Sequence, residues 1–255
     1  RVDAICGVTM TSWIDSDAGV AVQFSDGRTR DYRMVVAADG INSATRAALL
    51  PDCKPRPSGQ AVWRGEVPRP ADVRCTHLYM GGPQGLVGLC PVSEQLAYLY
   101  IVQAADPDNR RDPLTFHEQM RAELVGYQGY PADCAQFLDD PAKIRYSRID
   151  ALIAPPPWGA GQIVLIGDAV HSNPPTLAQG AAMGIEDAVV IAEELAQSPD
   201  DPHSAIARFI ARRHERAAFV VEQSCELARA EVEHDRSVDV QQIMRMVFGR
   251  LAQPI

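Results

Sequence analysis

Alternating apolar and polar residues near the start of the chain predict a small antiparallel sheet. The alternation covers residues 4–13 and 19–24, and each run has the length of an ordinary strand. Ser25-Asp26-Gly27 follows the second run and has the composition of a tight turn. We therefore expect a β-meander in this part of the chain.

A more continuously apolar run follows and has a charged residue at its end. Residues 32–38 end in Val-Val-Ala-Ala, which is typical of a buried strand, and Asp39-Gly40 comes directly after them. Asn42 or Ser43 can then cap a short helix. The pattern predicts a carboxylate at the carboxyl end of a strand.

The middle of the chain predicts a second, sheet-rich domain. Residues 51–60 contain three prolines and one glycine, a composition that favours a hinge. The apolar pattern then predicts four short strands, at 60–67, 75–80, 85–92 and 95–103. An apolar stripe predicts a helix over 113–128, and residues 143–149 predict a returning strand.

A strand, a turn and a helix are predicted after this domain. The proline-rich residues 154–159 form an extended connection to a β-branched run at 163–166. Gly167 ends that run, and the charged Asp168 stands at the end of the strand. The residue order again places a carboxylate where open α/β sheets bind ligands.

The helix after this aspartate strengthens the case for a ligand site. A turn with Pro and Asn covers 172–176, small residues predict a helix over 178–196, and amphipathic helices follow from residue 205. The N-terminus of a helix carries free N–H groups and partial positive charge. A carboxylate beside it suits a polyhydroxy ligand with negative charge, such as a nucleotide-like cofactor.

Composition narrows the classes of partner. The 255 residues carry a formal net charge of -9, with a pI near 5.1, which argues against a nucleic-acid surface or an anionic membrane as partner. No apolar run approaches the length of a membrane span and no signal-peptide pattern is present. We expect a cytoplasmic protein.

The cysteines and histidines give no support to a metal site. Neither residue type forms a C-x-x-C or H-E-x-x-H arrangement. The six cysteines are scattered singly and are expected to be reduced thiols: Cys6, Cys53, Cys75, Cys90, Cys134 and Cys225.

Two segments carry a family resemblance. The first has nine residues in a fixed order, namely Gly167, Asp168, Ala169, His171, Pro175, Gln179, Gly180, Asp187 and Ala188. This order resembles the second flavin-binding motif of the FAD-dependent aromatic hydroxylases, the para-hydroxybenzoate hydroxylase-like flavoprotein monooxygenases. The second segment, residues 39–46, is similar to the D-G-x-x-S-x-x-R motif of the same family.

The resemblance implies an activity and a cofactor site. It implies FAD as cofactor, NAD(P)H as cosubstrate, and a flavin hydroperoxide that hydroxylates an aromatic or heteroaromatic substrate. Asp168 is then expected to accept hydrogen bonds from ribityl hydroxyls, and the N–H groups of 177–180 to face the flavin ring. The implied cofactor-binding residues are Asp39, Arg46, Gly167, Asp168, Pro175, Leu177, Ala178, Gln179 and Gly180.

The sheet-rich domain supplies the candidate substrate residues. Tyr79, Tyr98 and Tyr100 offer faces on which a flat ring can stack, and Arg64 offers a charge for a carboxylate or phenolate. Arg64 is the strongest candidate because a charge within an apolar strand needs a partner. No catalytic residue is identified, and His171 is expected to hold the turn by a hydrogen bond.

The G-x-G-x-x-G fingerprint of this family does not follow a strand anywhere in the sequence. We therefore expect an α/β chain with an incomplete FAD-binding Rossmann-like domain, a mixed-sheet substrate domain and C-terminal helices. The expected segments are 1–57, 58–150, 151–200 and 201–255. A missing N-terminal segment or another chain would complete the FAD site, and this fragment alone is expected to be inactive and to hold FAD weakly.

Two alternatives to hydroxylation stay open at this point. The chain could be a flavin-free module that binds an aromatic ligand, or it could belong to a flavin-dependent reductase or oxidase that inserts no oxygen. The sequence does not distinguish NADH from NADPH and does not identify the substrate.

Overall fold

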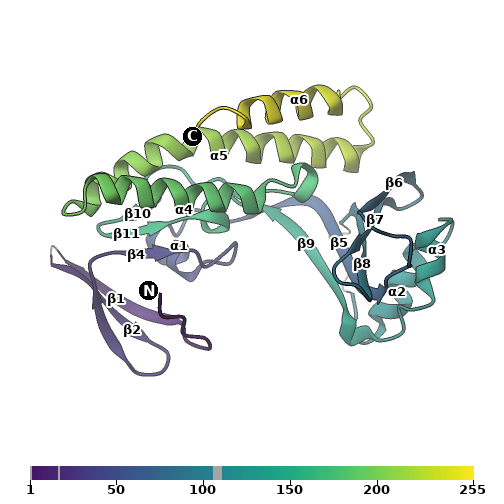
Figure 1. Cartoon of the computed structure of the whole chain (residues 1–255), viewed down its shortest axis with the longest axis horizontal. Coiled ribbons are helices and arrows are strands. Elements are labelled where there is room, and N and C mark those ends of the chain that lie inside the picture. The colour runs from purple at the N-terminus through teal and green to yellow at the C-terminus, as the bar shows by residue number, and fades with distance from the viewer. Residues whose placement is uncertain (1, 17, 106–110) are drawn as a thin grey trace. The chain divides into compact units, whose positions relative to one another are not determined.

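The computed structural model describes residues 2–16, 18–105 and 111–255, and the chain divides into two compact units (Figure 1). The first unit comprises residues 1–56, 151–225 and 239–255. The second comprises residues 57–150 and 226–238. Because each unit has its own sheet and core, each is described by itself.

The first unit begins with the expected meander. Strands β1 (Met10–Ser16), β2 (Gly19–Phe24) and β3 (Thr29–Tyr32) form an antiparallel sheet in the order β1-β2-β3. The first strand starts later than the predicted residue 4, since residues 4–9 have no strand partner. Val20 and Val22 are buried in a small core beneath this sheet.

A short parallel pair forms the centre of the first unit. Strand β4 (Val35–Ala37) pairs in parallel with β11 (Ile163–Leu165), and β10 (Gly159–Ala160) adds to the other side of β11. The expected strand over 32–38 is therefore divided between β3 and β4. Because β4 has no partner on its other side among the described strands, it is an edge strand.

Among the described residues, four α-helices belong wholly or partly to the first unit. They are α1 (Ala44–Leu49), α4 (Gly180–Gln197), α5 (Pro202–Glu233) and α6 (Val240–Leu251). The predicted cap of α1 is confirmed for Ser43, whose side chain accepts a hydrogen bond from the Arg46 amide. Trp158 and Phe209 are fully buried in the core that joins α4 and α5 to the parallel pair.

The second unit is built on a five-stranded sheet. Its order is β6-β7-β8-β5-β9, and the pairings β6–β7, β7–β8 and β8–β5 are antiparallel. The strands are β5 (Arg56–Pro68), β6 (His77–Gly82), β7 (Gly85–Pro91), β8 (Leu96–Ala104) and β9 (Ile144–Ala151). The predicted strand over 95–103 is confirmed as β8, in which Ala97, Leu99 and Ile101 are fully buried.

The helices of the second unit differ from the prediction. Helix α2 (Phe116–Glu123) follows a 3-10 turn, η1 (Pro113–Thr115), and ends before the expected residue 128. Gly126 has φ +93°, which an α-helix cannot accommodate. A further helix, α3 (Tyr130–Ala135), and the 3-10 turn η2 (Pro141–Lys143) were not predicted.

The described helices also bear on membrane insertion. Among residues 2–16, 18–105 and 111–255, no helix combines the length and the hydropathy that crossing a bilayer requires.

Candidate functional site

The two parallel strands bring the two sequence motifs together at the carboxyl ends of the strands. Val35 pairs with Ile163 and Ala37 with Leu165, so both strands end at the same level. Asp39-Gly40 follows β4, and Gly167 opens the 3-10 turn η3 (Gly167–Ala169) after β11. The residues that sequence analysis predicted at strand ends therefore meet at the edge where open α/β sheets bind ligands.

A cavity of about 550 Å³ lies at this edge. Of the predicted cofactor residues, Gly167, Asp168, Pro175, Ala178 and Gly180 line it. The remaining walls come from Ala38, Gly40, Ile166, Asn173, Ala181 and Gly184. Leu177, the last residue of the 3-10 turn η4 (Pro175–Leu177), is buried, and neither it nor Gln179 forms part of the wall.

Three polar features of the cavity suit a ligand that carries both donor groups, such as hydroxyl or N–H, and acceptor atoms. Asp168 is exposed, and its carboxylate has no hydrogen-bond or ion-pair partner within the described ranges. Asn173 Oδ1 is a buried acceptor without a donor, while its Nδ2 donates to Pro174 O at 2.8 Å. The first turn of α4 contains no acidic side chain that would occupy its N–H groups.

Small residues let the backbone approach whatever fills this cavity. A Cβ on Gly167 would lie 3.9 Å from Gly184 Cα, so the turn and α4 come close together here. Ala178 has φ +53° and ψ +30°, a left-handed conformation that costs a residue with a Cβ about 1 kcal/mol. A glycine at this position would avoid the cost.

Asp39 and Arg46 hold the first motif together instead of lining the cavity. Asp39 accepts hydrogen bonds from the Ser43 hydroxyl and, at 3.1 Å, from the Thr45 amide. Burial raises the pKa of Asp39, but these hydrogen bonds outweigh it and lower the pKa below its ordinary value. Arg46 is 4% exposed and donates to Ala169 O at 3.0 Å, Ile41 O at 2.6 Å and Cys53 O at 3.2 Å. A cofactor contact for either residue stays a prediction.

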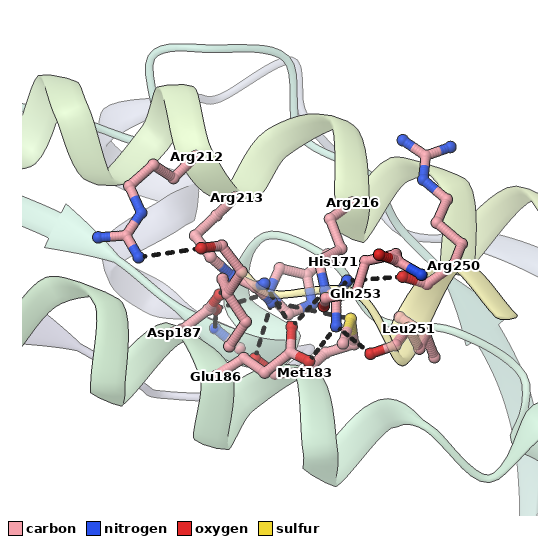
Figure 2. Close-up of polar contacts among 12 residues, drawn as sticks. His171, Met183, Glu186, Asp187, Arg212, Arg213, Arg216, Arg250, Leu251 and Gln253 are labelled. Carbon is pink, nitrogen blue, oxygen red and sulfur yellow. Dashed lines mark hydrogen bonds and ion pairs between the residues drawn. The ribbon is translucent and has the colours of Figure 1, made fainter. Parts of the chain in front are cut away.

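A largely buried ionic network links His171, Glu186 and Asp187 with two arginines of α5 (Figure 2). Asp187, on α4 and 0% exposed, accepts from the Gly167 amide at 2.8 Å. His171 Nε2 lies 2.6 Å from the same carboxylate, and Arg213 Nε donates to it at 2.8 Å. Burial raises the pKa of Asp187, but the hydrogen bonds from His171, Arg213 and Gly167 outweigh it and lower the pKa below its ordinary value.

The network continues to the end of the last helix. Glu186 forms ion pairs with both Arg213 and Arg216, and the Arg216 pair measures 2.8 Å. Arg216 also donates to the carbonyls of Arg250 at 3.1 Å and Leu251 at 2.8 Å, at the carboxyl end of α6 (Figure 2). Burial raises the pKa of Glu186, but its bonds to the two arginines outweigh it and lower the pKa.

In the second unit, the register of the sheet separates the candidate substrate residues. Arg64 lies opposite Tyr100 in the pairing of β5 with β8, and Gly88 of β7 lies on the other side of Tyr100. Because Tyr98 is two residues from Tyr100 on the same strand, the side chains of Arg64, Tyr98 and Tyr100 share one face of the sheet. The Tyr98 and Tyr100 rings lie 5.3 Å apart. Tyr79 belongs to the opposite face, where it packs against the buried core of the unit.

Two further features distinguish the face that carries Arg64. A Cβ on Gly88 would lie 2.1 Å from the Tyr100 ring, so that ring covers the strand at this glycine. Arg64 is exposed and has no hydrogen-bond or ion-pair partner in the part of the chain that the structure describes. The charge that sequence analysis expected to be paired is therefore available to a ligand.

Sequence reasoning missed several wall residues. Asn173 was assigned only to a turn, Gly40 was named only as part of the first motif, and Ala181 and Gly184 were not singled out. The spacing of Gly180 and Gly184 on one helix face was the available signal, because residues four apart in a helix are neighbours.

Comparison with known proteins adds a family match. A family model described as "FAD binding domain" matches residues 7–224. The chain is 33% identical to an aurachin C monooxygenase/isomerase of Stigmatella aurantiaca over 84% of this chain and 55% of that protein. It is 31% identical to a 2-heptyl-3-hydroxy-4(1H)-quinolone synthase of Pseudomonas aeruginosa over 86% of this chain and 57% of that protein.

A solved structure has the same fold. A variant of Klebsiella pneumoniae HpxO in complex with FAD matches with a TM-score of 0.79 and 25% identity, covering 96% of this chain and 63% of that one. This chain thus spans less than two thirds of the length of each of these three proteins.

Proposed function

The chain belongs to the FAD-binding domain family, and from this premise we propose that it carries the flavin end of a cofactor site in a monooxygenase. The proposed activity is hydroxylation of an aromatic or heteroaromatic substrate with NAD(P)H and dioxygen. The observation that carries the proposal is the cavity at the strand edge, with the unpartnered Asp168 carboxylate in its wall. A cytoplasmic location stays a prediction from the sequence.

The residues around the cavity fit FAD. Asp168 can accept hydrogen bonds from hydroxyl groups in pairs, and Asn173 Oδ1 can accept one from a ring N–H or a hydroxyl. The N-terminal turn of α4 offers N–H donors and a positive dipole end to negative charge. When bound, FAD would transfer electrons from NAD(P)H to dioxygen and insert one oxygen atom into the substrate.

We further propose that a segment outside this sequence completes the site, either in the same polypeptide or from another chain. The free edge of β4 can accept another strand, and Val36 on that edge is 43% exposed. The outward face of α4 is apolar, with Ile185 66% and Val189 46% exposed. The missing glycine fingerprint supports the same proposal.

The experiment uses this chain together with its completing segment. We expect the complex to purify yellow, to lose its colour with NADPH faster when an aromatic substrate is present, and to place an atom from ¹⁸O₂ in the product. Ile185→Glu should weaken binding between this chain and the completing segment, while this chain itself stays folded. A yellow complex that oxidises NADPH without labelled product would support the reductase or oxidase alternative, and a colourless one would contradict the flavin site.

We propose that the substrate binds on the sheet face that carries Arg64, Tyr98 and Tyr100. Stacking on the two rings and an ion pair with the free guanidinium would select a flat, anionic aromatic compound. The two relatives named above are an aurachin C monooxygenase/isomerase and a 2-heptyl-3-hydroxy-4(1H)-quinolone synthase, and a quinolone is a heteroaromatic ring system. Tyr79 is part of the same predicted set, although it lies on the other face.

Arg64→Ala tests this assignment. Loss of a charge-assisted hydrogen bond should raise the KM of a carboxylated or phenolic substrate about tenfold or more, with FAD content unchanged. Arg69→Ala is the matched control, because Arg69 already donates to Val73 O at 2.7 Å and Ser93 O at 2.9 Å. An equal KM for wild type and Arg64→Ala would remove Arg64 from the site.

A further inference from the structure

Asp187 is placed to control the shape of the cavity wall without entering the cavity. Its Oδ2 accepts from the Gly167 amide and lies 2.6 Å from His171 Nε2, while its Oδ1 accepts from Arg213. Gly167 and Asp168 line the cavity, whereas Asp187 is 0% exposed and does not. One buried carboxylate therefore ties the start and the end of the turn 167–171 to helix α4.

An ionised carboxylate can meet all three contacts at once, whereas the amide of Asn cannot. A carboxylate has acceptor sites on both oxygens, whereas an amide replaces one oxygen by a donor. An Asn side chain at position 187 would point its NH₂ group either at Arg213 or at the Gly167 amide and His171. In either orientation one donor faces another inside a buried site, which is costly.

The restraint extends beyond the turn. Arg213 reaches from α5 to both Asp187 and Glu186, and Arg213 Nη2 also donates to Met183 O at 3.2 Å. Arg216, one turn further along α5, shares Glu186 and holds three carbonyls at the end of α6 (Figure 2). A continuous set of charged contacts thus joins the cavity wall to the last helix.

We infer that Asp187 is a positioning residue for the flavin-binding turn, and that Glu186, Arg213 and Arg216 extend its restraint to the carboxyl end of α6. Through the Gly167 amide and His171, Asp187 sets the backbone direction from which Asp168 enters the cavity. The identity of the ligand rests on the proposed function, but the restraint on the turn does not.

Glu194 provides a matched control on the same helix. Its side chain is 4% exposed and forms ion pairs with two arginines of α5, Arg208 at 2.6 Å and Arg212 at 2.7 Å. It has no contact with residues 167–171 among the described hydrogen bonds and ion pairs. Glu194→Gln therefore removes a similar charge from a similar pairing and leaves the turn alone.

The test measures amide hydrogen exchange in this 255-residue chain without FAD. Loss of a hydrogen bond to a charged group should speed exchange of the Gly167 amide about tenfold or more in Asp187→Asn, while Glu194→Gln should leave it at the wild-type rate. Arg216→Met should produce a smaller increase at Gly167. Equal increases at Gly167 in Asp187→Asn and Glu194→Gln would show general loosening and overturn the inference.

Two further readouts keep the result decisive. The His171 variants provide a test that does not depend on the folding of Asp187→Asn. His171→Gln retains a side-chain donor and should preserve slow exchange of the Gly167 amide, whereas His171→Leu should speed it. Riboflavin titration of the same samples should show weaker binding for Asp187→Asn than for Glu194→Gln. If wild type does not bind riboflavin, the proposed function fails, while the exchange data still decide the role of Asp187.

Discussion

Arg213→Met should cost about 3–5 kcal/mol of unfolding free energy, the usual loss when one partner of a buried ion pair is removed. Arg213 is 0% exposed and pairs with Asp187 and Glu186. Met fills a similar volume but removes the arginine that bonds to the buried Asp187 carboxylate and one of the two arginines that pair with Glu186. Chemical denaturation measures the loss as a shift in the midpoint at constant slope.

The pH dependence of this loss follows from the direction of the pKa shifts. The pKa values of Asp187 and Glu186 are lowered in the folded chain, from ordinary values of 3.8 and 4.5. Lowered carboxyl pKa values contribute stability above the unfolded-state pKa, and this stability disappears as the pH falls through the folded-state values. The difference between wild type and Arg213→Met should therefore be largest at neutral pH and shrink as the pH falls below about 4.

An exposed arginine of the same helix is the control. Arg229 pairs with Glu226 at 2.7 Å, and the two side chains are 41% and 40% exposed. Because exposed ion pairs contribute little, Arg229→Met should leave the denaturation midpoint nearly unchanged. If Arg213→Met were as mild as Arg229→Met at neutral pH, the network could not be a main support of the first unit.

Asp168→Ala should weaken flavin binding about tenfold to a hundredfold, which corresponds to the loss of hydrogen bonds to a charged acceptor. Asp168 is exposed and has no partner within the described residues, so its removal breaks no internal contact. Stability should change by no more than about 0.5 kcal/mol. Fluorescence titration with flavin gives the affinity, and thermal unfolding of the same sample gives the stability.

Asp168→Asn separates the charge from the shape of the side chain. The amide keeps one acceptor oxygen, so its affinity for flavin should lie between those of wild type and Asp168→Ala. A large loss of stability in either variant would mean that Asp168 supports the fold. Unchanged affinity in both would remove this residue from the cofactor site.

The sequence predicted the local parts of the site because they depend on local chemistry. Gly167 and Asp168 follow a short β-branched run, and Ser43 caps a helix, so neighbouring residues carry both signals. The α/β fold class and the family are confirmed by the structure and the comparisons. The early end of α2 and the presence of α3 were missed, although Gly126 and Gly129 mark both boundaries.

Long-range pairing explains what the sequence did not predict. Arg213 meets Asp187 from a separate helix, and no local pattern specifies which of several arginines on α5 will be the buried one. Sequence analysis assigned Tyr79 and Tyr100 to the same substrate set, but the strand register places them on opposite faces. The extent of β4 was also overestimated, because its length is set by its three-residue pairing with β11.

The central claim is that the cavity at the ends of β4 and β11 binds the flavin half of FAD. The most direct measurement is titration of this chain with riboflavin, followed by competition with FAD and with ADP. Our account predicts saturable riboflavin binding that FAD displaces, that ADP leaves unchanged and that Asp168→Ala weakens. Displacement by ADP, or riboflavin binding that is equal in wild type and Asp168→Ala, would contradict it.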